Sequence, residues 1–208
     1  MKRLALFILP LIVVAPLGAA APKAKPAATS SAAATSKISA GVYNLDNNHA
    51  LIGWTINHFG FNDYFGMFSQ PTGTLNLDPA KPNAATVMIE IPINKVVTGS
   101  DKLTGHLQTA DFFNAAKFAT ATFKSTSVKV SGTTAVITGD LTMLGITKPI
   151  TLNAKLSGAG TNILSKKETV GFHATASIKR SDWGITKYLP ALGDKVDLNI
   201  TAAFEKAG

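Results

Sequence analysis

Large apolar side chains recur at every second position through most of this chain, and this periodicity limits the possible folds more than any other feature. In the stretch from residue 42 to residue 70 it is clearest at Ile52, Trp54 and Ile56, which alternate with small or polar residues. An alternation with period two is typical of a β-strand that has one dry face and one solvated face. The row continues to His58, so an imidazole ends an otherwise apolar face.

The first strand is predicted to be long and bent. Tyr43 and Leu45 have the opposite parity to Ile52, and a bulge near Asn47 and Asn48 would bring both halves onto one dry face. Similar alternation follows over residues 73–78, 87–93, 119–130, 137–143, 146–156, 170–178 and 196–204. Half-solvated strands favour antiparallel pairing, and closing eight of them into a barrel removes the exposed edges. The sequence therefore predicts an all-β fold, an eight-stranded antiparallel barrel.

One helical region interrupts the strands, between the third and the fourth. Ser100 and Asp101 are expected to cap a short helix that runs through Leu107, and Asp111 a second one over residues 112–117. Pro92 lacks a backbone N–H, so the strand that precedes these two helices is predicted to stop pairing with its neighbour at that residue. In the fourth strand, the apolar parity changes before Val128.

Three segments make up the predicted domain organisation. In residues 1–21, two basic residues precede an apolar run from Leu4 to Leu17 and then small residues, which is the pattern of a cleaved secretory signal. Residues 22–40 are rich in Ala, Pro, Ser, Thr and Lys and predict a flexible linker. Residues 41–208 have the length of one domain. No second run is long enough to span a bilayer, so the mature chain is not expected to span a membrane.

Charge and cysteine content exclude several classes of function. Of 20 basic residues, five lie before residue 41, so 15 remain beside 12 acidic residues and the domain carries about +3. No basic stripe interleaves with aromatic residues, so nucleic acid is not an expected partner. The chain has no cysteine, which rules out disulfides and, together with export, favours a bacterial periplasm.

Motifs for catalysis are missing from the sequence, which has no phosphate loop, dinucleotide fingerprint or nucleophile elbow. Its four histidines are far apart in sequence, so a metal site would have to assemble from separate strands. We therefore predict no enzyme, no metal and no cofactor. His58 is either a satisfied core histidine or a group facing the polar end of a ligand, and Arg180 ends its own dry row in the same way.

Six segments together resemble the YceI-like family, in the right order from about Tyr43 to Phe204. They are Tyr43-Asn44-Leu45-Asp46; Asn57-His58-Phe59-Gly60; Gly66-Met67-Phe68; Gly105-His106-Leu107-Gln108-Thr109-Ala110-Asp111-Phe112-Phe113-Asn114-Ala115; Gly139-Asp140-Leu141-Thr142-Met143-Leu144-Gly145-Ile146-Thr147-Lys148-Pro149-Ile150; and Ile178-Lys179-Arg180-Ser181-Asp182-Trp183-Gly184-Ile185. The resemblance implies a lipocalin-like barrel, exported to the periplasm, whose tunnel holds a polyisoprenoid or another long-chain amphiphilic lipid without catalysis.

The main hypothesis is thus a binding or carrier protein, and its ligand contacts are predicted from the dry faces. An eight-stranded barrel is wide enough either to be filled by side chains or to hold one small ligand. A packed interaction or stress module without ligand, and a His58-assisted enzyme acting on a lipid-like substrate, remain alternatives, and a homodimer is left open. The predicted ligand-binding residues are Ile52, Trp54, Ile56, His58, Phe68, Leu75, Val87, Ile89, Ile91, Phe113, Phe123, Leu141, Met143, Phe172, Ala174, Ile178, Arg180 and Trp183.

Overall fold

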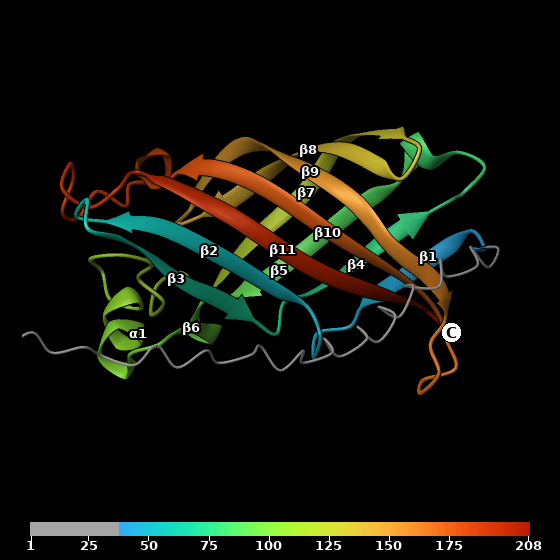
Figure 1. The fold of residues 1–208 in the computed structure, drawn as a ribbon, viewed down its shortest axis with the longest axis horizontal. Helices are drawn as coiled ribbons and strands as arrows, with labels where there is room; N and C mark the ends of the chain where they lie inside the picture. The colour runs from blue at the N-terminus through green and yellow to red at the C-terminus, as the bar shows by residue number, and fades with distance from the viewer. Residues whose placement is uncertain (1–37) are drawn as a thin grey trace, which may run out of the picture. The chain divides into compact units, whose positions relative to one another are not determined.

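The computed structural model describes residues 38–208, which form an antiparallel β structure with one short α-helix (Figure 1). The predicted signal and most of the predicted linker lie outside the described residues. The elements in order are β1 Gly41–Leu45, β2 Leu51–His58, β3 Asn62–Ser69, β4 Thr72–Leu77, η1 Pro82–Ala84, β5 Thr86–Pro92, η2 Ile93–Lys95, β6 Val96–Thr98, α1 Asp101–Leu107, β7 Thr120–Ser131, β8 Thr134–Met143, β9 Ile146–Thr161, β10 Glu168–Lys179, η3 Arg180–Trp183 and β11 Lys195–Lys206.

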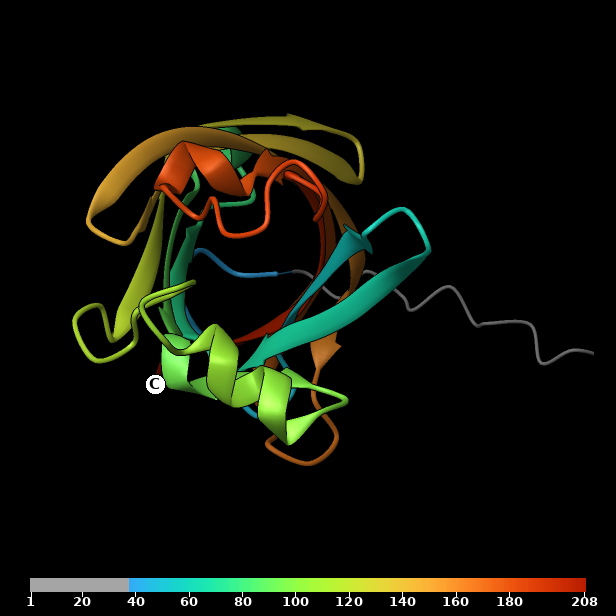
Figure 2. The same ribbon diagram turned by 90° about the vertical axis from the view of Figure 1, so that its left-hand side faces the viewer.

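Eight strands close into a ring, which confirms the predicted barrel. Neighbouring strands pair in the order β1, β4, β5, β7, β8, β9, β10 and β11, and β11 returns to pair with β1. Strands β2, β3 and β6 continue the sheet at one end, where β2 pairs with β11 and β3 pairs with β6. Viewed from that end, the ring surrounds a common interior (Figure 2).

The predicted bend in the first strand is a break between β1 and β2. Leu45 lies opposite Phe204 of β11, and Leu51 lies opposite Thr201. The chain advances six positions from Leu45 to Leu51, while β11 advances only three from Phe204 to Thr201. The three extra residues are an odd number, so they reverse which sequence positions point inward. As a result, Tyr43 and Ile52 both face the interior although they have opposite parity in the sequence.

Two other irregularities occur where the sequence predicts them. The β7–β8 register shifts between Ser125 and Ser127, just before Val128, so the apolar side chains stay inside after the shift. Strand β5 ends at Pro92, which cannot donate a backbone hydrogen bond.

Helix α1 has the predicted start and end, but the second predicted helix is wrong. The Ser100 hydroxyl accepts the backbone N–H of Leu103 at 3.4 Å and caps α1. Residues 112–117 form turns, in which Phe113 N–H bonds to Leu107 C=O, and Asn114 has a left-handed φ of 45°. Asp111 does not cap a helix, because its carboxylate pairs with His106 and Lys187.

The buried apolar side chains form two clusters along the barrel. The larger fills the end covered by α1 and the loop after η3, with Leu107, Phe112 and Trp183 among its members. The smaller surrounds Tyr43 and Phe204 near the start of β1. Among residues 38–208, no helix has the length and apolar content needed to cross a membrane.

Candidate functional site: an apolar cavity in the barrel

Between these two clusters, the barrel contains a cavity of about 340 Å³. Every barrel strand contributes to its wall, because alternate side chains of each strand point inward. Apart from three threonines (Thr133, Thr134 and Thr201) the lining side chains are apolar, and none of them is charged. Such a surface can bind hydrocarbon, and the three threonine hydroxyls are the only polar side-chain groups among the lining residues described.

The structure brings twelve of the eighteen predicted ligand-binding residues together around this cavity. They lie on seven different strands and occupy the inward positions of each. The twelve are Ile52, Phe68, Leu75, Val87, Ile89, Ile91, Phe123, Leu141, Met143, Phe172, Ala174 and Ile178.

Three of the other six, Trp54, Ile56 and Phe113, pack against the larger cluster beside the cavity and do not line it. Trp54 lies over Gly66 of β3, where an added Cβ would be only 2.1 Å from the Trp54 ring. Glycine is therefore required at position 66 for the indole to lie flat against the sheet. Trp54 Nε1 is buried and has no hydrogen-bond partner within residues 38–208.

Arg180 and Trp183 are also buried, but their polar atoms are used within the fold. The Arg180 guanidinium, only 4% exposed, donates to the backbone carbonyls of Gly193 at 2.7 Å, Ile185 at 3.0 Å and Leu192 at 3.2 Å. Burial lowers the pKa of Arg180, while the nearby carboxylate of Asp194 acts in the opposite direction. Arg180 therefore organises the loop over residues 184–194.

Trp183, on η3, helps to close the same end of the barrel. Its Nε1 donates to the Leu141 carbonyl at 3.2 Å, and its side chain is 1% exposed. Neither Arg180 nor Trp183 lines the cavity.

His58 is neither a core histidine nor a group at the polar end of the cavity, so both sequence-based interpretations of it are wrong. It is the last residue of β2 and pairs with Asn62 at the tip of the β2–β3 hairpin, beyond the barrel interior. Its ring is exposed and packs edge-on against Phe59, with 4.6 Å between the ring centroids. The dry row of β2 thus ends at Ile56, because the strand leaves the barrel before it reaches His58.

The other histidines have separate polar neighbours on the surface. His49 lies 2.7 Å from Asp46, His106 lies 3.0 Å from Asp111, and His173 lies 2.8 Å from Asn199. Among residues 38–208, no three His, Asp or Glu side chains converge on one point.

The mouth of the cavity includes residues that the periodicity did not indicate. Pro79, Gly132 and Thr133 are exposed lining residues, which places an opening between the β4–β5 connection and the β7–β8 turn. Ile38, expected to belong to the linker, also lines the cavity. These residues lie in turns or before the first strand, where no two-residue period exists.

A polar cluster holds the segment after Ile38 against the barrel. The hydroxyl of buried Tyr43 lies 2.6 Å from Glu168 Oε1 and 2.7 Å from the Ser39 carbonyl, and it can donate to either oxygen. Ser39 Oγ donates to Glu168 Oε2 at 2.6 Å, and Lys206 Nζ donates to the Ala40 carbonyl at 2.9 Å.

The surroundings in this cluster shift the pKa values of Tyr43 and Glu168. Burial, followed by the hydrogen bond and negative charge of Glu168, raises the pKa of Tyr43 to about 12. Partial burial raises the pKa of Glu168, but hydrogen bonds from Ser39 and Tyr43 and the charge of Lys206 outweigh it, so the pKa of Glu168 lies below its usual value.

The fold and the cavity define a class: a small closed antiparallel β-barrel whose interior is an apolar chamber. Within this class, residues 43–204 match the model of the YceI-like domain. Protein YceI of Salmonella arizonae and Protein YceI of Salmonella heidelberg are each 40% identical to this chain over 164 residues, which cover 78% of this chain and 85% of the relative. The chain belongs to the YceI-like family.

Solved structures agree with this assignment. The YceI protein of Campylobacter jejuni is 30% identical, with a TM-score of 0.65 over 74% of this chain and 91% of that one. BcnA of Burkholderia cenocepacia shares the fold at 21% identity, with a TM-score of 0.66 over 74% of this chain and 95% of that one. A domain from Saccharophagus degradans described as polyisoprenoid-binding shares the fold at 17% identity, with a TM-score of 0.58 over 79% of this chain and 98% of that one.

Proposed function

We propose that this protein is a periplasmic carrier that holds a polyisoprenoid or a comparable long-chain amphiphilic lipid inside its barrel. The observation that carries the proposal is the cavity of about 340 Å³, whose wall is apolar except for three threonines. The description of the Saccharophagus degradans domain as polyisoprenoid-binding supports the same ligand class.

The composition of the wall favours a long hydrocarbon over a polar metabolite. Each methylene moved from water into an apolar site contributes about 0.8 kcal/mol, whereas a buried polar group without a partner is costly. Hydroxyl groups are found at Thr133 and Thr134, in the β7–β8 turn region of the wall. An amphiphile would place its tail among the apolar strands and its head group near this exposed turn.

Mass spectrometry of an organic extract tests the proposal directly. The protein is purified without detergent and extracted with chloroform and methanol, and the extract is compared with that of the Ala174→Trp variant, in which an indole occupies the cavity. A long-chain lipid that is present at near one equivalent in the wild type, and depleted in the variant, is the expected result. Equal amounts of the same lipids in both extracts would show that they adhere to the outside.

Export is the second part of the proposal and rests on the sequence of residues 1–21. The short apolar run followed by small residues supports cleavage near Ala21 or Pro22. N-terminal sequencing of protein recovered from a periplasmic extract is expected to begin there. A chain that still begins at Met1 and sediments with membranes would contradict this part, while leaving the cavity proposal intact.

A further inference from the structure

The β9–β10 loop, residues 162–167, exposes two large apolar side chains to water. Ile163 is 80% exposed and Leu164 is 86% exposed. Exposing a neighbouring pair of this size costs solvation free energy that an internal position would recover. The loop tip therefore has the composition of a contact surface.

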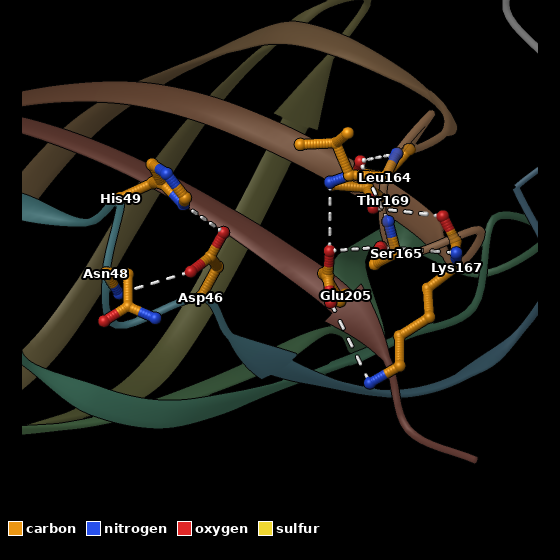
Figure 3. Close-up of polar contacts among 9 residues, drawn as sticks. Asp46, Asn48, His49, Leu164, Ser165, Lys167, Thr169 and Glu205 are labelled. Atoms are coloured by element: carbon orange, nitrogen blue, oxygen red, sulfur yellow. Dashed lines mark hydrogen bonds and ion pairs between the residues drawn. The ribbon is translucent and has the colours of Figure 1, made fainter.

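Hydrogen bonds within this loop and to β11 anchor it with the apolar pair directed outward. Asn162 Oδ1 accepts the Leu164 N–H at 2.9 Å. Glu205 Oε1, on β11, accepts the Ser165 hydroxyl at 2.6 Å and the Asn162 side-chain amide at 3.0 Å (Figure 3). The loop is thus anchored at its base and presents its tip outward.

Two lysines follow the apolar pair directly. Lys166 and Lys167 are both exposed, and no ion pair of Lys166 is found within residues 38–208. Lys167 Nζ lies 3.8 Å from Glu205 Oε2, while the other oxygen of that carboxylate is bound inside the loop. The tip is therefore apolar, and the adjoining Lys166 carries a positive charge that is in no ion pair found within residues 38–208.

The loop lies at the same end of the barrel as the mouth of the cavity, although none of its own residues lines the cavity. The loop ends just before Glu168, whose carboxylate accepts a hydrogen bond from Ser39. Ser39 is the neighbour of Ile38, which lines the cavity, so the base of the loop lies close to the cavity wall. Figure 1 shows the loop projecting beyond the strands at the end of the barrel where the chain terminates, opposite the β2–β3 turn.

We propose that this loop docks the protein on an anionic lipid bilayer, with Ile163 and Leu164 inserted at the interface and Lys166 and Lys167 against the lipid phosphates. Apolar side chains flanked by basic ones are the combination that an anionic membrane surface attracts, through hydrocarbon burial and through its negative potential. Docking in this orientation brings the end of the barrel that carries the cavity mouth close to the bilayer. The proposal concerns a surface and holds whatever the cavity contains.

The β2–β3 hairpin is the competing surface. Phe61 there is 89% exposed and Phe65 is 67% exposed. However, Asp63 lies between them in the sequence, and residues 58–66 contain no lysine or arginine, so the hairpin has no basic residue beside its apolar tip. Charge complementarity to an anionic surface therefore favours the β9–β10 loop.

A reporter at each tip distinguishes the two surfaces. Ile163→Trp and Phe61→Trp are made separately in the full chain and mixed with phosphatidylglycerol–phosphatidylethanolamine vesicles whose acyl chains carry bromine. The indole at position 163 is expected to be quenched and blue-shifted, while the indole at position 61 stays in water. Once the wild-type signal of Trp54 and Trp183 is subtracted, the readout is local, so attachment of the chain through any other segment does not imitate it. Quenching at position 61 alone, or at neither position, overturns the proposal.

Cosedimentation measures the contributions of the two parts of the tip. Ile163→Ser with Leu164→Ser is expected to weaken partitioning onto these vesicles at least tenfold, because two exposed hydrocarbon side chains no longer insert. Lys166→Gln with Lys167→Gln is expected to weaken it about 30-fold at low salt, and to make no difference on neutral phosphatidylcholine. Val136→Ser, on the outer barrel wall, is the matched control and should change nothing. Unchanged partitioning in both double variants rules the proposal out. The same outcome is expected if the tip binds only a protein.

Discussion

Replacing Ala174 by tryptophan tests whether the barrel is hollow in solution. Ala174 lies in the middle of β10, is 8% exposed and lines the cavity. In a close-packed interior, an inserted indole would cost about 1–3 kcal/mol or more. In the cavity of about 340 Å³, the same ring has space, so Ala174→Trp is expected to change the free energy of unfolding by less than about 1 kcal/mol.

The loss of ligand binding can be calculated from the cavity volume. At roughly 30 Å³ for a group of the size of water or methylene, about 340 Å³ holds about eleven groups. At about 0.8 kcal/mol each, they provide about 9 kcal/mol before ordering costs. An indole displaces about five of them, so the ligand loses about 4 kcal/mol, or about a thousandfold in affinity.

Ala176→Trp is the matched control, because Ala176 lies two residues further along the same strand. It has the same inward parity and is also 8% exposed, but it does not line the cavity. Ala176→Trp is therefore expected to show the full overpacking cost, measured by urea unfolding. Affinity is measured by titration with the fluorescent fatty acid cis-parinaric acid. Equal destabilisation by both substitutions, with equal loss of probe binding, would refute the reasoning and show that the interior is packed throughout.

Three further predictions concern the wall, the polar cluster and metal. Ile89→Ala should destabilise the fold by less than the roughly 2–5 kcal/mol typical of a packed core, because one side of Ile89 faces the cavity; calorimetry measures this, and the full cost would contradict it. Tyr43→Phe should cost about 1.5–3 kcal/mol at pH 7 by removing the hydrogen bond to Glu168. Because the pKa of Tyr43 is raised from 10.0 to about 12, its contribution is complete below pH 10 and is lost as the pH rises through about 12, so the variant and the wild type should converge there in urea melts. Incubation with EDTA should leave the melting temperature unchanged, and a large drop would point to a metal that bridges separate histidines.

The periodicity of the sequence was enough to predict the barrel, because alternation in a strand has one physical cause. A strand with one buried face places every second side chain inside, so the parity of Tyr43 and Ile52 already required an odd number of extra residues between them. The cap at Ser100 could be predicted for a similar reason, since a hydroxyl at that position satisfies an N–H within the same turn.

Predictions that depended on where an element stops were weaker. His58 continues the apolar row in sequence, but β2 leaves the barrel before His58, and sequence parity alone contains no information on that point. Residues 112–117 also carry a helical signal, yet their backbone bonds to the preceding turn and Asp111 pairs with side chains distant in sequence. Long-range partners outweighed local propensity there.

The sequence by itself therefore determined the inward set of each strand, and through it most of the cavity wall. Only the tertiary structure decided which inward residues face empty space and which are packed. Ala174 and Ala176 have the same type, strand, parity and burial, yet only Ala174 lines the cavity. Likewise, the sequence does not show that Ile163 and Leu164 are exposed to water. Their exposure depends on hydrogen bonds between their loop and Glu205, which lies some forty positions later in the chain. Packing against distant residues cannot be read from local periodicity, because it depends on how the whole ring closes.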